Sequence, residues 1–127
     1  MGSFSGNSKF SWWVSGSGDI TIAGHDGKNL KAGKVINLEV DYNPATDGAR
    51  IFENALLYYG EFNDKTSHDF MNPNLWRGRG RVEITANAKG VLSGSFQGTL
   101  SRINGEGPSS VTMNGNFAGI AQDPLDR

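Results

Sequence analysis

The sequence has no cysteine, only two histidines and only four prolines among its 127 residues. The lack of cysteine excludes disulfide bonds, a thiolate nucleophile and cysteine-ligated metal sites. Apolar runs are all far shorter than the roughly 18 residues that a transmembrane helix needs, so no such helix is predicted. Because the net charge is only −1, nothing in the overall charge balance points to nucleic acid or to an anionic membrane as a partner.

Catalytic and metal-binding patterns are also scarce. His25 and His68 are each followed by an aspartate, but adjacent residues of an extended chain point in opposite directions. Neither histidine belongs to a recognisable metal-binding spacing, and both fall in segments predicted as turn or loop. Serines are frequent, yet none stands in a Gly-x-Ser-x-Gly elbow with plausible partners. We therefore predict no catalytic residue, no metal and no cofactor.

Glycine and small polar residues are abundant instead. The chain has 18 glycines, and its hydrophobic content of 36% is low. Many short, half-buried strands would give that content, and so would a cavity lined by polar groups. The clearest strands lie in the last third of the chain, at 81–86, 91–101 and 111–120.

The second and third of these strands share the pattern Gly-x-Phe-x-Gly, at 94–98 and 115–119. With a period of two, the glycines and phenylalanines occupy one face and polar residues occupy the other, as in half-buried antiparallel strands. Glycine disfavours a strand by about 0.5–1 kcal/mol, so its repeated use needs a reason. The structural explanation, which we prefer, is that the strands coil sharply and a ring covers bare backbone. The functional alternative is space for a ligand.

Earlier segments add four strand-like runs, at 10–14, 19–23, 34–42 and 55–62, of which the last is largely apolar on both faces, and an Asp-Gly turn is expected at 25–28. Seven or eight strands without a convincing helix predict an all-β fold, an antiparallel up-and-down barrel, with a β-sandwich as the alternative. We assign 9–121 to one barrel domain, 1–8 to a flexible segment and 122–127 to a polar tail. Residues 63–76 are predicted as an irregular loop that is long enough to be functional.

The order of these motifs resembles small lipocalin-like domains of bacterial secreted proteins and lipoproteins. The residues that carry the resemblance span Asp19 to Ile120 and include Ile20-Thr21-Ile22, the 36–42 strand, Tyr58-Tyr59, Leu92-Ser93-Gly94-Ser95-Phe96 and Met113-Asn114-Gly115-Asn116-Phe117. The resemblance implies a barrel and an extracytoplasmic setting, periplasmic or secreted, with the leader removed. It implies no catalytic residue. Trp12-Trp13 and the arginine run described next lie outside the pattern.

Arg77-Gly78-Arg79-Gly80-Arg81 is the most unusual local feature of the sequence. In an extended chain the three guanidinium groups point the same way, about 6–7 Å apart. Such a row could clamp a carboxylate, a phosphate or a nucleic-acid backbone. The alternative, which we prefer, is a solvated strand paired with acidic residues such as Glu83 or Asp41.

Aromatic residues supply the candidate ligand-binding site. Most should belong to the core, but a subset at a barrel mouth could stack on a sugar or hold an apolar ligand. The residues that we select for this site are Tyr59, Trp76, Arg79, Trp12 and Tyr58.

The leading functional hypothesis is a non-enzymatic barrel that holds a small apolar, amphipathic or sugar ligand. A protein-interaction domain of the immunity or inhibitor type, with a filled barrel, is the first alternative. A small-barrel isomerase or cyclase is the second, with Glu39, Glu61 or Glu83 as its acid–base group. The expected partner is a small molecule or a protein, without nucleic acid and without a membrane span.

Overall fold

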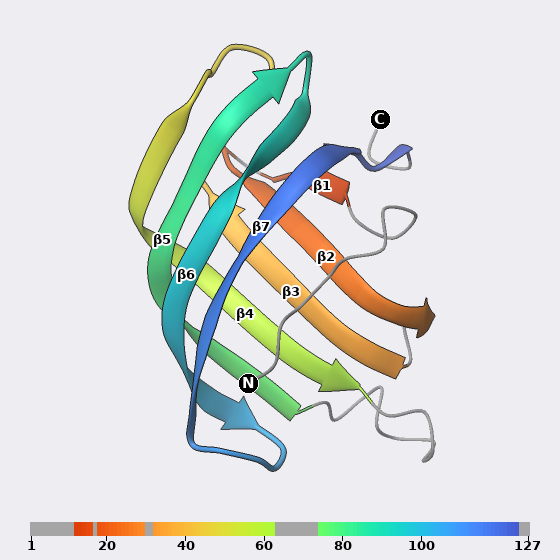
Figure 1. Ribbon diagram of the computed structural model, residues 1–127, viewed down its shortest axis with the longest axis vertical. Coiled ribbons are helices and arrows are strands. Elements are labelled where there is room, and N and C mark those ends of the chain that lie inside the picture. Colours follow the sequence, from red (N-terminus) through yellow and green to blue (C-terminus); the bar gives the residue numbers. More distant parts are fainter. Residues whose placement is uncertain (1–11, 17, 30–31, 63–73, 125–127) are drawn as a thin grey trace.

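The computed structural model describes residues 12–16, 18–29, 32–62 and 74–124. These residues form seven strands and no helix long and apolar enough to cross a membrane. The strands in Figure 1 are β1 (Trp12–Ser15), β2 (Ile20–Asn29), β3 (Ala32–Val40), β4 (Arg50–Phe62), β5 (Asn74–Ala88), β6 (Val91–Asn104) and β7 (Ser110–Gln122). The predicted all-β class is confirmed. The predicted flexible segment 1–8 and most of the predicted loop 63–76 lie outside the described residues.

Each strand pairs in antiparallel fashion with the next one along the chain, and β1 also pairs with β7. Seven up-and-down strands are an odd number, so the closing pair has to be parallel, as it is here. The described part of this seam contains only two residue pairs, Trp12 with Ala121 and Trp13 with Gln122. The up-and-down barrel predicted from sequence is confirmed, and the chain does not adopt the sandwich.

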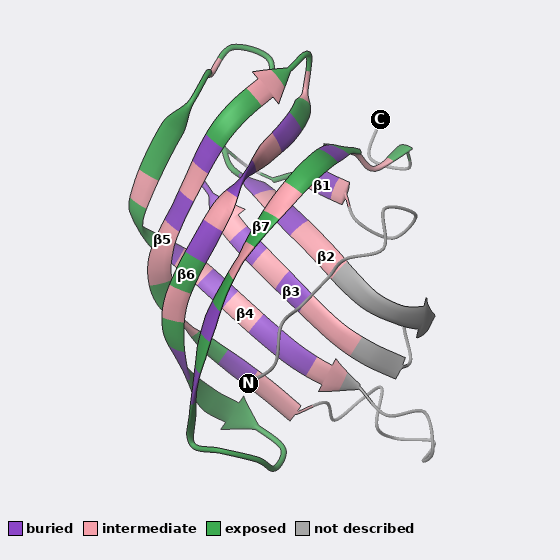
Figure 2. Cartoon of the chain, viewed as in Figure 1, coloured by how far each residue is buried: buried purple, intermediate pink, exposed green. Residues whose placement is uncertain are grey.

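The ring encloses a continuous hydrophobic core, because alternate residues of every strand point inward. Figure 2 shows the resulting alternation of buried and exposed positions along the ribbons. Nineteen buried residues make up the core: Trp13, Ile20, Ile22, Ile36, Leu38, Val40, Tyr42, Ala55, Leu57, Tyr59, Trp76, Val82, Ile84, Leu92, Phe96, Leu100, Val111, Met113 and Ile120. Seven strands give a narrow ring, and these side chains form one hydrophobic cluster inside it.

The repeated Gly-x-Phe-x-Gly pattern explains how β6 and β7 pack. Register places Phe96 opposite Gly115 and Gly94 opposite Phe117. A Cβ atom on Gly115 would lie 2.8 Å from Cζ of Phe96, and one on Gly94 would lie 2.7 Å from Cζ of Phe117. Each ring therefore covers the bare backbone of the neighbouring strand, and the structural explanation of these glycines is confirmed.

Gly119 departs from the predicted pattern. The sequence placed it on the same face as Val111 and Phe117, but its φ of +65° puts it in a bulge. Across this bulge, Leu92 pairs with Ile120 while Gly94 pairs with Phe117, so β7 carries one extra residue. The extra residue turns Ile120 into the core, where it is buried.

Three strand boundaries also differ from the prediction. Residues 25–28 are not a turn, because β2 continues through them and its ladder with β3 extends past His25. Strand β4 begins at Arg50, since a bulge between Phe52 and Ala55 lets the strand continue on both sides. Strand β5 begins at Asn74, so the arginine run lies inside a long strand instead of preceding one. At 25–28, cross-strand pairing with β3 overrides the local Asp-Gly turn signal.

We expect Gly94→Ala to destabilise the fold by about 2–3 kcal/mol, because the new Cβ would collide with the backbone oxygen of Glu83 as well as with Phe117. Gly48→Ala is the control, since Gly48 has no neighbour within 4 Å of a Cβ position and should change stability by no more than about 0.5 kcal/mol. The measurement is the midpoint of urea unfolding. Equal midpoints for the two variants would contradict the packing described here.

Candidate functional site

Tyr59 and Trp76, two of the residues selected from the sequence, are direct cross-strand neighbours inside the barrel. Both are almost fully buried. Their ring centroids lie 5.5 Å apart, and the angle between the two ring planes is 37°. The Trp76 Nε1 donates to the carbonyl oxygen of Pro108 at 2.8 Å, and the Tyr59 hydroxyl donates to Oε2 of Glu61 at 2.9 Å. The polar atoms of the pair are thus already engaged within the protein, and both rings pack in the core.

The other selected residues lie on the outer surface of the ring. Tyr58 pairs with Arg77, and Arg79 pairs with Leu56, both on the face opposite to Tyr59. Trp12 is half-buried at the seam, and its neighbour Trp13 points into the core. The structure therefore brings Tyr59 and Trp76 together and leaves Tyr58, Arg79 and Trp12 on outward positions.

The arginine run lies in the middle of β5 with its side chains pointing away from the core. Arg77 and Arg79 are exposed and Arg81 is half-buried, while the alternating Val82 is fully buried. The expectation that the three guanidinium groups share one direction is confirmed. Arg81 Nη2 lies 3.5 Å from Oε1 of Glu83 on the same strand. An ion pair with Glu83 was part of the preferred expectation for this run, a solvated strand paired with acidic residues. Both side chains remain more than a third exposed, so this ion pair adds little stability.

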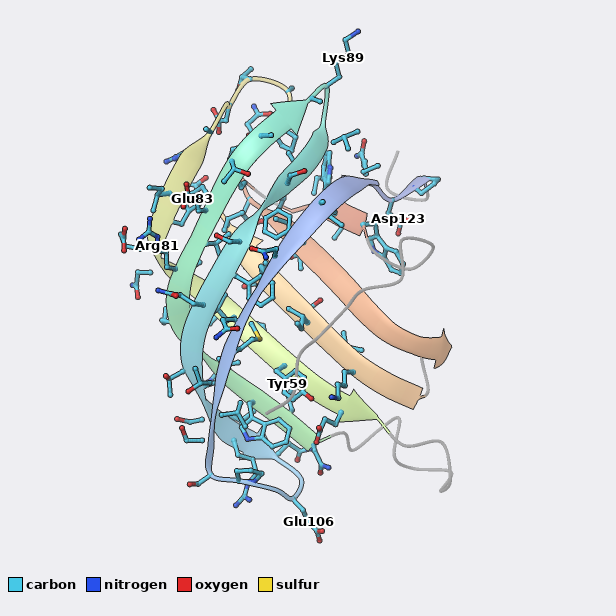
Figure 3. The ribbon with its side chains drawn as sticks, viewed as in Figure 1. Tyr59, Arg81, Glu83, Lys89, Glu106 and Asp123 are labelled. Carbon is cyan, nitrogen blue, oxygen red and sulfur yellow. The ribbon has the colours of Figure 1, made fainter. Side chains whose placement is uncertain are left out.

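Register extends the arginine row into a two-dimensional array on the outer face of β5, β6 and β7. We call this array the polar ladder. Its four rows of three are Arg77–Ser101–Ser110, Arg79–Thr99–Thr112, Arg81–Gln97–Asn114 and Glu83–Ser95–Asn116. None of the twelve is buried, and none is apolar. Figure 3 shows Arg81 and Glu83 projecting outward from the sheet.

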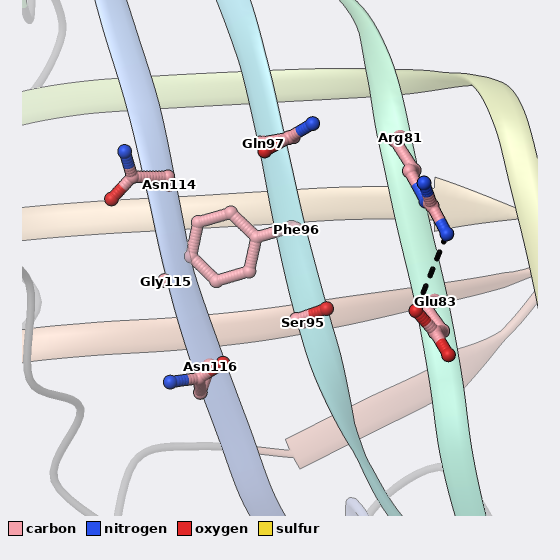
Figure 4. Close-up of a pocket in the computed structure, with 8 residues that line it drawn as sticks. All are labelled: Arg81, Glu83, Ser95, Phe96, Gln97, Asn114, Gly115 and Asn116. Atoms are coloured by element: carbon pink, nitrogen blue, oxygen red, sulfur yellow. Dashed lines mark hydrogen bonds and ion pairs between the residues drawn. The ribbon is translucent and has the colours of Figure 1, made fainter.

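Two rows of the ladder line a hollow of about 450 Å³, which we call the amide hollow (Figure 4). Its lining consists of Arg81, Glu83, Ser95, Phe96, Gln97, Asn114, Gly115 and Asn116. The side-chain amides of Gln97, Asn114 and Asn116 are exposed and make no hydrogen bond to any residue that the structure describes. Figure 4 shows the Phe96 ring reaching from β6 towards Gly115 on β7, with the ion pair on β5 beside them.

The chemistry of the amide hollow suits a ligand rich in hydroxyl groups. Each side-chain amide offers two N–H donors and one carbonyl acceptor, and a sugar hydroxyl can pair with either. Arg81 adds donors and Glu83 adds acceptors at one margin of the hollow. Neighbouring rows are about 7 Å apart and neighbouring strands about 5 Å apart, so the lining spans the footprint of a small saccharide.

Two further hollows occupy other parts of the surface. One, of about 550 Å³, lies at the β4 bulge and is lined by Asp19, Glu39, Val40, Asp41, Ile51, Phe52, Glu53, Asn54, Ala55, Leu56 and Arg79. The other, of about 410 Å³, lies at the β5–β6 turn and is lined by Trp13, Pro44, Ala45, Lys89, Gly90, Val91, Ala121 and Gln122. Each has a mixed polar and apolar lining, and neither gathers unengaged amides as the amide hollow does.

The candidate acid–base residues are scattered over the ring. Glu39 lies in the hollow at the β4 bulge and Glu83 in the amide hollow, whereas Glu61 is half-buried beside Tyr59. His25 lies in β2, and His68 falls outside the described residues. Within the described ranges, no three acidic or histidine side chains come close enough together to hold a metal ion.

Sequence reasoning did not select Gln97, Asn114 or Asn116. Their signal was present, because they lie on the polar face opposite the phenylalanines and glycines. What the sequence could not give was the register that aligns the polar faces of three strands. Comparisons of the chain with protein-family models, with curated proteins and with solved structures give no match.

We expect Asn116→Ala to change the free energy of unfolding by no more than about 0.5 kcal/mol, because its side chain is exposed and holds nothing in place. Asn87→Ala is the matched contrast. Asn87 Nδ2 donates to the carbonyl oxygens of Pro44 and Asp47 at 2.8 and 2.7 Å, and its Oδ1 accepts from the Gly90 amide at 2.8 Å. Losing these three bonds should destabilise the fold by about 2–4 kcal/mol in urea unfolding. A comparable loss in Asn116→Ala would mean that this amide is structural.

Proposed function

We propose that the chain is a non-enzymatic binding domain that holds a saccharide in the amide hollow, on the outside of its barrel. The observation that carries the proposal is the cluster of three exposed side-chain amides, Gln97, Asn114 and Asn116, that make no hydrogen bond to the described residues. They line one hollow from two neighbouring strands. A group that is solvated in the free protein and rigidly placed by a sheet is well suited to exchange water for ligand hydroxyls.

The same reasoning moves the expected site from the inside of the barrel to its surface. Tyr59 and Trp76 pack against each other in a hydrophobic core, and their polar atoms are bonded within the protein. A ligand in that place would have to displace core side chains. The resemblance to lipocalin-like domains stays a prediction, and under this proposal only the barrel is shared with them.

Binding through one hollow should be weak. A net contribution of about 0.5–1.5 kcal/mol for each hydrogen bond, from about four to six bonds, leaves little after the cost of association. We therefore expect dissociation constants for small saccharides in the range from about 0.1 to 10 mM.

A protein-interaction domain is the second candidate, and the hollow at the β4 bulge favours it. Ile51 is 47% exposed at this hollow, which also contains four carboxylates, of Asp19, Glu39, Asp41 and Glu53. An apolar contact surrounded by negative charge would suit a partner with a basic surface.

The test is a titration of the protein with a panel of mono- and disaccharides, in which binding is measured by NMR chemical-shift changes at backbone amides. We expect shifts to concentrate at Gln97, Asn114 and Asn116, and we expect the double variant Asn114→Ala/Asn116→Ala to weaken binding at least about tenfold. Glu106→Ala is the control, because Glu106 is exposed in the distant β6–β7 hairpin (Figure 3). This variant should bind saccharides with the same affinity as the unaltered protein. Binding that the double variant leaves unchanged, or no binding across the panel, would refute the proposal.

A further inference from the structure

The polar ladder continues beyond the amide hollow, and its β5 column carries the positive charge. Arg79 lies in the first row beyond the hollow, beside Thr99 of β6, and Arg77 lies in the second row, beside Ser101. Strand geometry places the Cα atoms of successive arginines about 7 Å apart along one face of β5. A ligand in the hollow that continued along β5 would meet these cations in turn.

Arg77 and Arg79 form no ion pair within the described ranges, although Arg79 also lines the hollow at the β4 bulge, which contains four carboxylates. Arg81 has one ion pair, to Glu83. Arg79 donates only to the backbone carbonyl oxygen of Asn54, at 3.2 Å. The Arg77 side chain makes no hydrogen bond or ion pair to any residue in the described ranges. The ladder thus contains three arginines against one glutamate, although the chain as a whole has a net charge of −1.

Exposed guanidinium groups with unused donors are good partners for carboxylates, which they can bind with two parallel hydrogen bonds. The two other columns of the ladder offer hydroxyl and amide groups alone, on Ser, Thr, Asn and Gln. One margin of the surface therefore suits regularly spaced anions, and the remainder suits neutral hydroxyl groups.

We propose that the ligand is an acidic polysaccharide that runs parallel to the strands over the outer face of β5, β6 and β7. Its carboxylates bind Arg77 and Arg79, and its hydroxyl groups bind the polar side chains of the β6 and β7 columns. This inference rests on the proposed saccharide function and adds to it both the length of the site and the charge of the ligand. A polymer that contacts several rows would also bind more tightly than a small saccharide in one hollow. Once one sugar unit is bound, the neighbouring units are held close to the next rows at a high effective concentration.

A single-stranded nucleic acid carries regularly spaced anions too, but the ladder fits it less well. Proteins that bind single strands use aromatic side chains as stacking platforms for the bases. None of the twelve ladder residues is aromatic, and among the cross-strand partners of the three arginines only the half-buried Tyr58 is aromatic. Sugar hydroxyls, in contrast, match the Ser, Thr, Asn and Gln side chains that fill two of the three columns.

The test compares binding to polygalacturonate and to the same polymer after full methyl esterification, which removes the charge and keeps the sugar backbone. We expect the acidic form to bind at least about tenfold more tightly at low salt, and this preference to shrink as salt is raised. Arg77→Gln should lower affinity for the acidic form by about 3- to 10-fold and leave the esterified form unchanged. Lys89→Gln removes the same charge from a remote turn and should change neither.

Each contrary outcome has a separate meaning. Equal affinity for the two polymers, or an Arg77→Gln variant that binds like the parent, would overturn the acidic-ligand inference while the saccharide function stands. Binding of an oligothymidylate in preference to both polymers, with the same loss in Arg77→Gln, would overturn it in favour of nucleic acid. If neither the polymers nor the small saccharides bind, both proposals fall together.

Discussion

Closing a sheet of only seven strands on itself is the constraint on which the rest of this protein depends. Such a ring is narrow, so its strands have to coil strongly and lie close to one another. In this chain, large side chains on one strand lie opposite glycines on the neighbouring strand, which lets the strands approach closely. Phe96 lies over Gly115 and Phe117 over Gly94, while Leu57 reaches the space left by Gly80 and Gly98. Rings and glycines thus form one interlocked set across β4 to β7.

The inner face is used for packing. Tyr59 and Trp76 are almost fully buried there and pack against each other. The same period of two that sends phenylalanine and leucine inward sends polar residues outward on β5, β6 and β7. Where the strands are in register, these outward residues line up across the sheet. The polar ladder is in this sense a by-product of strand alternation.

Strand alternation was readable in the sequence, and so were the fold class, the core positions of β6 and of β7 as far as Phe117, and the role of the glycines that face Phe96 and Phe117. Strand ends were less predictable. An Asp-Gly signal at 26–27 suggested a turn, and the irregular loop was expected to extend to residue 76, but cross-strand ladders keep 25–29 and 74–76 extended. Local turn propensity is weak compared with a row of cross-strand hydrogen bonds, which depends on residues far away in the chain.

The candidate site was harder to predict than the fold, for a related reason. The sequence showed Arg77, Arg79 and Arg81 as a row, because that row follows from one strand alone. Gln97 and Asn114 are 17 positions apart and come together only through register. Register in turn depends on the hairpin between β6 and β7 and on the packing of Phe96 against Gly115, neither of which a pattern of single residues reveals.

The parallel seam between β1 and β7 has a consequence for how the barrel forms. Trp12 pairs with Ala121, more than 100 positions further along the chain, whereas every other strand pairs with its immediate successor. The six hairpin contacts can form in sequence as the polypeptide leaves the ribosome, but the seam has to wait for the last strand. Closing so large a loop is slow, so a nearly complete open sheet should precede the ring. During that interval the unpaired edge of β7, which carries no charged residue and no proline over its 13 positions, would be the segment most exposed to aggregation.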